Sequence, residues 1–393
     1  MKHVIVIPDG AADDPRPELD GRTPLEAART PNMDALTREG RLGLVSTIPP
    51  GQSPGSDVAM LSILGYDPAR YYTGRAPLEA ASLGVSLGSR DVAFRCNLVT
   101  VEDDTLLDYS AGEITSEEAR ILMALIRDKL GSGRIEFYPG VSYRNLMVWR
   151  EGSDNLRTTP PHDIMGQLIQ PHLPTGDGED MLRSLMEASR ELLDGHDVNK
   201  RRLDEGKRPA NMIWFWGQGR SPDLPNLALR FGAPGCVIAA VDLVRGIARL
   251  AGLASPKVPG ATGNLNTDFA AKARAAVEAL EKYDFLLVHV EAPDEAAHHG
   301  DPEAKVWAIE QVDGKVLEPV MQALKATGPH RILLLPDHRT TIAARTHEAG
   351  PVPFVLAGEG IRPRGASKFC EAAAEETRVF VGEGHRLIED LFS

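Results

Sequence analysis

The sequence predicts an α/β protein whose doubly wound core sheet is interrupted by an inserted α+β domain. Both ends of the chain alternate short apolar runs with helical patterns, which is typical of parallel sheets covered by helices. The middle of the chain instead predicts strand–strand–helix–strand–strand, the order of an antiparallel unit. The 393 residues are enough for two domains. We expect the core over residues 1–89 and 221–393, and the inserted domain over residues 90–220.

Composition and charge exclude several classes of function. Hydrophobic residues make up 42% and charged residues 25%, which is ordinary for a globular protein. The formal net charge of −13 argues against nucleic acid or an acidic membrane surface as a partner. The three cysteines are widely spaced and suit a reducing compartment. Since no signal peptide or membrane-spanning run is evident, we expect a cytoplasmic soluble protein.

The first predicted strand covers residues 3–7 and ends at Pro8-Asp9-Gly10. An aspartate before a glycine is commonly a turn residue. Asp9, however, has the same placement after an apolar run as two later aspartates. We therefore favour a metal ligand at this position.

Ser56 begins a helical pattern that follows a proline- and glycine-rich turn over residues 49–55. A serine at this place is often a helix cap, and on its own this would be the better interpretation. The amino end of a helix also favours a bound phosphate. With metal ligands elsewhere in the chain, a nucleophile activated by metal coordination becomes the better account.

The remaining elements follow from apolar periodicity and capping residues. In the inserted domain we expect helices over 116–130 and 179–193, and strands over 93–101, 105–109, 134–138, 143–149 and 211–216. In the second part of the core we expect strands over 237–241, 286–290, 332–335 and 354–357, and helices over 243–250, 269–283 and 385–391.

Acids and histidines follow two of these core strands. Asp294 and His298 come after residues 286–290 and are four residues apart, so one helical turn would place them on one face. Asp337 and His338 come after residues 332–335, and His347 follows shortly. The carboxyl ends of parallel strands share one edge of a sheet, where α/β proteins place their sites. This set of ligands suits divalent metals and is too large for one tetrahedral site.

The motifs in this order resemble one known family. They are Pro8-Asp9-Gly10, the turn over residues 54–59 with residues 64–68 behind it, residues 293–298, Asp337-His338, and His347 followed by residues 351–353. Each motif alone is weak, but the combination is specific. The chain is similar over nearly its whole length to the cofactor-independent phosphoglycerate mutases of the archaeal type, in the alkaline phosphatase superfamily.

The resemblance implies a role for each motif residue. One divalent ion would be held by Asp9, Ser56, Asp337 and His338, and a second by Asp294, His298 and His347. Ser56 would accept the phosphoryl group while 2-phosphoglycerate and 3-phosphoglycerate are interconverted. Oxygen and imidazole ligands suit Mn²⁺ or Mg²⁺, with Zn²⁺ as a further option. His299 stands beside His298 and could replace it.

Three alternatives remain open at this point. Residues 214–219 and 288–296 look more like a bacterial branch of the family that is proposed to act as homoserine kinase. A metal-dependent phosphohydrolase would use the same serine, with water attacking the phosphoserine. A metal-stabilised scaffold without turnover is opposed by the intact nucleophile.

A small phosphorylated acid needs positive partners. The candidates are Arg75, Arg95, Arg144, His162, Arg202 and Gln218, with Lys200, Lys207 and Arg220 as further cations. A single arginine is more often a solvated surface charge. We favour Arg95 and Arg144 because apolar or strand residues flank them, and we expect the inserted domain to act as a mobile lid.

Overall fold

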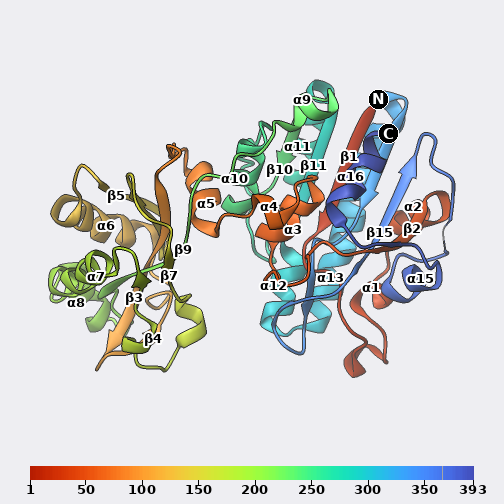
Figure 1. Cartoon of the computed structure of the whole chain (residues 1–393). Helices are drawn as coiled ribbons and strands as arrows, with labels where there is room; N and C mark the ends of the chain where they lie inside the picture. The colour runs from red at the N-terminus through yellow and green to blue at the C-terminus, as the bar shows by residue number, and fades with distance from the viewer. Residues whose placement is uncertain (365) are drawn as a thin grey trace. The chain divides into compact units, whose positions relative to one another are not determined.

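The computed structural model describes residues 1–364 and 366–393, which form two compact units (Figure 1). The core unit comprises Met1–Tyr72 and Asp223–Ser393, and the inserted unit comprises Thr73–Pro222. The insertion begins at residue 73 rather than at the expected residue 90. The reason is that α5 (Arg75–Leu83) packs its apolar residues Ala76 and Ala80 against the sheet of the inserted unit.

The core unit contains a seven-stranded mixed sheet. In spatial order its strands are β10 (Gly235–Ile238), β11 (Phe285–Val290), β1 (Lys2–Pro8), β12 (His330–Leu334), β15 (Val352–Gly358), β2 (Arg41–Val45) and β16 (Phe380–Val381). The first four strands are parallel to one another. β15 runs antiparallel to both of its neighbours. The α/β core expected from the sequence is therefore confirmed, with β2 and β16 as additional strands.

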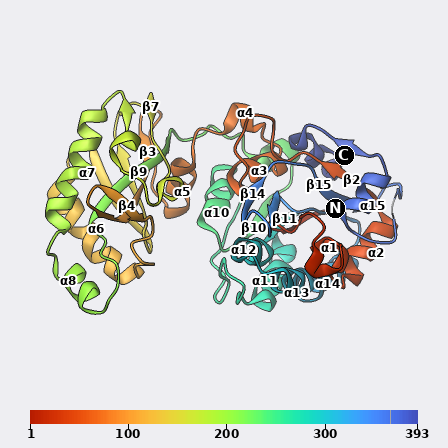
Figure 2. The same cartoon turned by 90° about the horizontal axis from the view of Figure 1, so that it is seen from below.

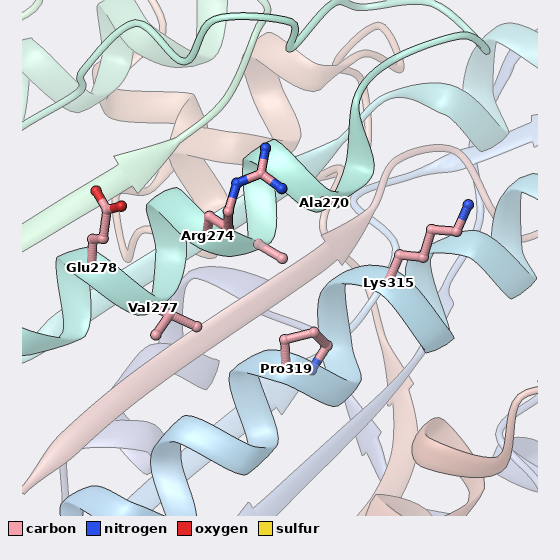
Figure 3. A pocket seen from close by; sticks show the side chains of 7 residues that line it. Ala270, Arg274, Val277, Glu278, Lys315 and Pro319 are labelled. Carbon is pink, nitrogen blue, oxygen red and sulfur yellow. The ribbon is translucent and has the colours of Figure 1, made fainter.

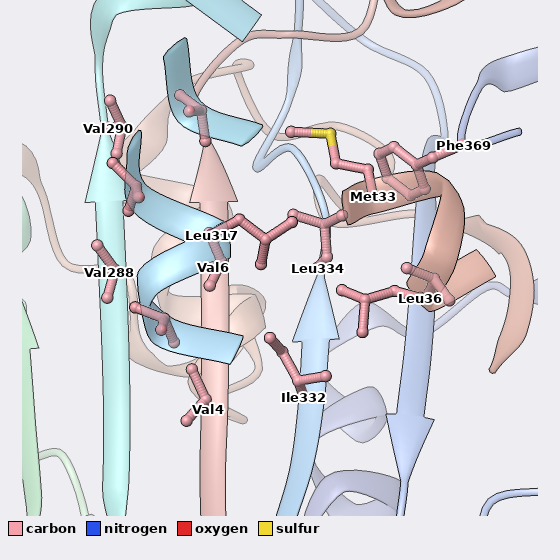
Figure 4. Close-up of a cluster of buried hydrophobic side chains, with 14 of the residues drawn as sticks. Val4, Val6, Met33, Leu36, Val288, Val290, Leu317, Ile332, Leu334 and Phe369 are labelled. Atoms are coloured by element: carbon pink, nitrogen blue, oxygen red, sulfur yellow. The ribbon is translucent and has the colours of Figure 1, made fainter. Parts of the chain in front are cut away.

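Helices cover both faces of this sheet. Alternate residues of the three central parallel strands, such as Val4 and Val6 of β1, point into one apolar cluster with Leu317 (Figure 4). The helices on that face are α2 (Pro31–Glu39), α11 (Phe269–Lys282), α13 (Pro302–Val312) and α14 (Glu318–Thr327). Burying one such side chain contributes roughly 1.5–3 kcal/mol, so this cluster holds the strands in register.

The opposite face of the core sheet is covered by α3 (Ser56–Ile63) and α10 (Asp242–Leu250), which Figure 2 shows, and by α16 (Leu387–Phe392), which packs on β12. There the ring of Phe392 lies 4.4 Å from that of His3. The smaller elements of the unit are η1 (Pro17–Leu19), α1 (Pro24–Ala27), α4 (Pro68–Tyr71), α9 (Leu227–Phe231), α12 (Ala292–His299), the π-turn η4 (Asp313–Leu317), β13 (Arg339–Thr341), β14 (Thr346–Glu348), α15 (Glu371–Glu376) and η5 (Gly384–Arg386).

The inserted unit is an antiparallel α+β fold with its own core. Its sheet joins β4 (Thr105–Asp108), β3 (Val92–Glu102), β6 (Arg144–Trp149) and β5 (Ile135–Val141), and β9 (Met212–Gly219) also pairs with β3. The helices are α5, α6 (Ser116–Leu130), α7 (Glu179–Leu193) and α8 (Asp197–Asp204), with short β7 (Leu156–Arg157), β8 (Thr175–Gly176), η2 (Pro161–Ile164) and η3 (Gln170–His172). The buried apolar side chains of this unit form one cluster, whose members all lie between Val92 and Trp216. Because the cluster contains residues of the insertion alone, the unit has the hydrophobic core of a separate domain. Across the described residues, no helix is both long and apolar enough to cross a bilayer.

Candidate metal centre

Seven predicted residues gather at the carboxyl edge of the core sheet. Asp9 directly follows β1, and α12, which starts two residues after β11, carries Asp294 and His298. The pair Asp337-His338 follows β12. His347 lies on β14 and Ser56 is the first residue of α3. Since β1, β11 and β12 are parallel, their ends bring together residues that are distant in the sequence.

One group of candidate ligands consists of Asp294, His298 and His347. The Nε2 atom of His298 lies 3.2 Å from Asp294 Oδ2 and 3.1 Å from His347 Nε2. His298 Nδ1 is 2.9 Å from the carbonyl oxygen of Arg345, which directs its Nε2 into the group. His299 instead faces Glu295 and is 62% exposed. The geometry therefore favours His298 over His299.

The second group consists of Asp9, Asp337, His338 and Ser56. The Nε2 atom of His338 lies 3.4 Å from Asp9 Oδ1, 3.5 Å from Asp337 Oδ2 and 3.1 Å from Ser56 Oγ. Thr340 links the two groups, since its Oγ1 donates to Asp294 Oδ1 at 2.6 Å and lies 3.1 Å from His338 Nδ1. Ligand atoms of Asp9, Asp294 and His338 also lie within 4.8 Å of one another. The two groups are thus adjacent parts of one cluster.

The electrostatics of this cluster fit a cation. Burial and the neighbouring carboxylates of Asp337 and Asp294 raise the pKa of Asp9 well above its usual range. Among the described residues, the buried atoms Asp9 Oδ1 and Asp337 Oδ2 have no hydrogen-bond partner. Buried polar atoms without partners are costly, and a bound positive ion removes that cost. The oxygen and imidazole donors therefore fit divalent metal ions.

Gly10 allows the Asp9 turn to approach the cluster. Its φ is +59°, and a Cβ there would lie 2.5 Å from both Asp294 Oδ1 and Thr340 Oγ1. Its backbone N–H donates to Asp337 Oδ1 at 3.2 Å. A larger residue would therefore strain the backbone and separate the two groups of ligands.

Ser56 is presented to the cluster by the start of α3. The residue in the cap position is Gly55, so Ser56 is already inside the helix. The next residue, Asp57, accepts hydrogen bonds from the backbone N–H of Val58 and the hydroxyl of Tyr72. The hydroxyl of Ser56 contacts His338, and it lies at the end of the helix that attracts anions. The capping interpretation of Ser56 therefore does not hold.

His289 also lies at the cluster, although the sequence analysis did not select it. It lies on β11 opposite Ile7 of β1, and its Nε2 is 3.4 Å from Asp9 Oδ2 and 3.7 Å from Asp337 Oδ2. Burial alone would lower its pKa, but the facing carboxylates of Asp337 and Glu291 raise the pKa of His289 to about 9. A polar residue inside the apolar run 286–290 was the available clue.

Four of the predicted substrate residues lie near one another in the inserted unit. The Arg95 guanidinium sits 4.3 Å from the ring centre of Trp216, and its Nε is 3.0 Å from Glu79. Burial, together with nearby Arg75 and Arg144, lowers the pKa of Arg95 to about 10, although Glu79 opposes the shift. His162 also packs on Trp216, with ring centres 5.2 Å apart. Burial, with nearby Arg95, lowers the pKa of His162 although Asp163 at 3.7 Å opposes the shift. The cations of this group are therefore the three arginines, with Glu79 beside Arg75 and Arg95.

Arg202 and Gln218 have other partners. Arg202 is buried and donates to Glu118 at 2.8 Å and to the carbonyls of Ala111 and Arg208. Gln218 accepts from the Thr158 hydroxyl and donates to the Leu156 carbonyl, both at 2.6 Å. The polar groups of both residues are therefore used within the fold. We remove Arg202 from the substrate candidates, and we assign Gln218 a structural role in holding residues 156–158.

Two cavities lie elsewhere in the core unit. The first, of about 350 Å³, is lined by Ala270, Arg274, Val277 and Glu278 of α11 and by Lys315 and Pro319 (Figure 3). The second, of about 890 Å³, lies between α11 and residues 253–259. The lining of both is outside the metal cluster, so neither is the candidate active site.

The fold and the cluster define a class: α/β proteins with a two-part set of candidate metal ligands beside a helix-terminal serine. The sequence model of the 2,3-bisphosphoglycerate-independent phosphoglycerate mutases matches residues 37–199. The chain belongs to this family, because it is 51% identical to the mutase of that name from Methanothrix thermoacetophila over 100% of both chains. It is also 50% identical to a probable mutase of the same name from Geobacter sulfurreducens, over 99% of each.

Solved structures agree with this assignment. A protein of Pyrococcus horikoshii superposes with a TM-score of 0.83 at 32% identity, covering 100% of this chain and 98% of its own. The cofactor-independent phosphoglycerate mutase of Thermoplasma acidophilum superposes with a TM-score of 0.67 at 28% identity, covering 100% and 99%. Both matches include the core and the insertion.

Proposed function

We propose that this protein interconverts 3-phosphoglycerate and 2-phosphoglycerate through a phosphate ester on Ser56. The observation that carries the proposal is the position of Ser56 Oγ, 3.1 Å from His338 Nε2 within a cluster of seven metal-ligand candidates. The membership of the mutase family supports the choice of substrate.

The candidate ligands would divide between two divalent ions. Asp294, His298 and His347 would hold one ion, and Asp9, Ser56, Asp337 and His338 would hold the other. Such ions neutralise charge on the phosphoryl oxygens and lower the pKa of a coordinated hydroxyl. Mn²⁺, Mg²⁺ and Zn²⁺ are the ions that these donors suit.

The reaction consists of two phosphoryl transfers. Ser56 Oγ first forms a bond to phosphorus while the bond between phosphorus and the C3 oxygen of glycerate breaks. Ser56 loses its hydroxyl proton in this step, and the released C3 oxygen gains one. The glycerate then turns, and its C2 oxygen takes the phosphoryl group from Ser56, which regains a proton. No water is consumed, so the site must exclude water while the ester exists.

The candidate partners of the acid substrate in the inserted unit are Arg75, Arg95, Arg144 and His162. The three arginines are favoured because guanidinium forks match carboxylate and phosphate geometry. The insertion acts as a lid, which agrees with the need to protect the phosphoserine from hydrolysis.

The first test replaces the nucleophile. Ser56→Ala should lower turnover of 3-phosphoglycerate by several orders of magnitude, because no phosphoserine can form. Ser53→Ala, in the exposed turn before α3, is the matched control and should keep full activity. Intact-mass analysis after a substrate quench should show one added phosphate on wild type and none on Ser56→Ala.

The same assay separates the alternative activities. Interconversion of the phosphoglycerates by the Ser56→Ala protein would refute the nucleophile. Phosphorylation of homoserine from ATP, without turnover of phosphoglycerate, would replace the mutase with the kinase. Release of inorganic phosphate at the rate of substrate loss would instead indicate a hydrolase.

A further inference from the structure

His289 is a fully buried histidine that faces the cluster from inside the sheet. Its side chain is 0% exposed. Its Nε2 atom lies 3.4 Å from Asp9 Oδ2 and 3.7 Å from Asp337 Oδ2. Asp9 thus presents one oxygen to His289 and the other to His338. The two histidines approach the same pair of carboxylates, His289 from β11 and His338 from the segment between β12 and β13.

The contacts of His289 Nε2 with Asp9 and Asp337, at 3.4 and 3.7 Å, are longer than hydrogen bonds and close to the spacing of ligands around one ion. Among the described residues, neither ring nitrogen has a hydrogen-bond partner, and the same holds for Asp337 Oδ2. Two atoms that each lie about 2.1 Å from one ion are about 3.0–3.5 Å apart. A cation placed between these three side chains would contact His289 Nε2 and both carboxylates together.

Glu291 is placed to orient the ring from the other side. Its Oε1 lies 3.3 Å from His289 Nδ1 and accepts the backbone N–H groups of Ala240 and Val241. Its second oxygen pairs with the fully buried Lys272. A carboxylate behind the second ring nitrogen is the usual arrangement for a metal-ligating histidine, because it directs the free Nε2 lone pair at the ion.

Burial alone does not explain this arrangement. His3 is also a buried histidine, and it lies on β1 in the same sheet. Its ring, however, packs against that of Phe392. Only the placement of His289 joins a backing carboxylate on one side to two ligand carboxylates on the other.

We infer that His289 Nε2 is a further ligand of the ion held by Asp9 and Asp337. This inference rests on the two-ion site of the proposed function, and it adds a ligand from β11 to those at the strand ends. Because His289 lies on β11 within the sheet, its ring would fix how far the ion lies from the ends of the strands.

The direct test is a crystal structure of the full chain with Mn²⁺, using anomalous scattering to locate the ions. The expected distance from Nε2 to the ion is about 2.2 Å. A distance above about 3 Å, with both ions present, would overturn the inference and leave the proposed function intact. Absence of any ion from the cluster would refute both.

Variants provide an independent readout through metal affinity. His289→Leu should weaken the binding of one of two Mn²⁺ ions by at least about 100-fold in calorimetric titrations, while the other ion still binds. In Co²⁺-loaded protein, the visible spectrum should change because one nitrogen ligand is lost. His289→Gln serves as a second variant if His289→Leu fails to fold.

His3→Leu is the matched control, because it removes a buried histidine from the same sheet away from the cluster. It should bind both ions with wild-type affinity and give an unchanged Co²⁺ spectrum. Equal Mn²⁺ affinity and identical Co²⁺ spectra for folded His289 variants and wild type would refute the ligand.

Discussion

The two units of the chain differ in the partners that their buried charged side chains have. In the core unit, acids and histidines crowd at 3.1–3.7 Å, and several of their buried atoms lack hydrogen-bond partners among the described residues. In the inserted unit, the buried Arg202 meets a carboxylate and backbone carbonyls, and Arg95 meets Glu79. The carboxylate oxygens of the core cluster therefore need added cations, whereas Arg202 in the insertion is satisfied by protein groups alone.

Removing metal should produce the largest difference between the units. We expect EDTA treatment to abolish turnover and lower the thermal stability of the core unit, because Asp9, Asp294 and Asp337 then repel one another. Activity assays and calorimetry would measure this, and added Mn²⁺ should restore both properties. Full turnover after complete chelation would contradict the two-ion site.

Breaking the Arg202 network should affect the insertion instead. Arg202→Ala leaves Glu118 and several carbonyls without their buried partner, so we expect a loss of roughly 3–5 kcal/mol of stability. Denaturant unfolding would measure it, with Mn²⁺ affinity expected to stay unchanged. The exposed neighbour supplies the control, since Arg201→Ala should be nearly neutral. Equal stabilities of the two variants would disprove a structural role for Arg202.

Arg144→Ala tests the positive group in the insertion at an exposed position. We expect KM for 3-phosphoglycerate to rise about tenfold with little change in melting temperature, because one charged contact to an anion is lost. Arg120→Ala, on the exposed face of α6, should leave KM unchanged. An unaltered KM for Arg144→Ala would exclude Arg144 from substrate binding.

The smallest expected effect is on the pH dependence of stability. Hydrogen bonds from Arg150 lower the pKa of Glu136, and they also lower the pKa of Asp91 against the opposing effect of burial. Since these folded-state pKa values are depressed, their stabilisation is present above about pH 4 and is lost as the pH falls through them. Arg150→Gln should therefore flatten the fall in melting temperature below pH 4. Parallel curves for variant and wild type would argue against the effect.

The clustering of the candidate ligands was predictable because the aspartates follow a strong local pattern. Asp9, Asp294 and Asp337 come after apolar runs, and strand direction alone places them together. His289 was missed because a residue inside a run is assigned to the sheet interior, and only the structure shows which way it faces. The roles of Arg202 and α5 depend on packing between distant segments, which periodicity does not report. β2 was missed because its five residues give too short a pattern.

The position of β1 in the sheet has a consequence for synthesis on the ribosome. Its neighbours β11 and β12 begin at residues 285 and 330, so β1 leaves the ribosome long before either can pair with it. At about 5–20 residues per second, translation takes roughly 15–60 s to reach them. The insertion, which ends at Pro222, is completed within that interval. The apolar strand β1, which precedes Asp9, stays unpaired throughout it. Chaperone capture of nascent chains should therefore concentrate on the first 72 residues and end once β12 has emerged.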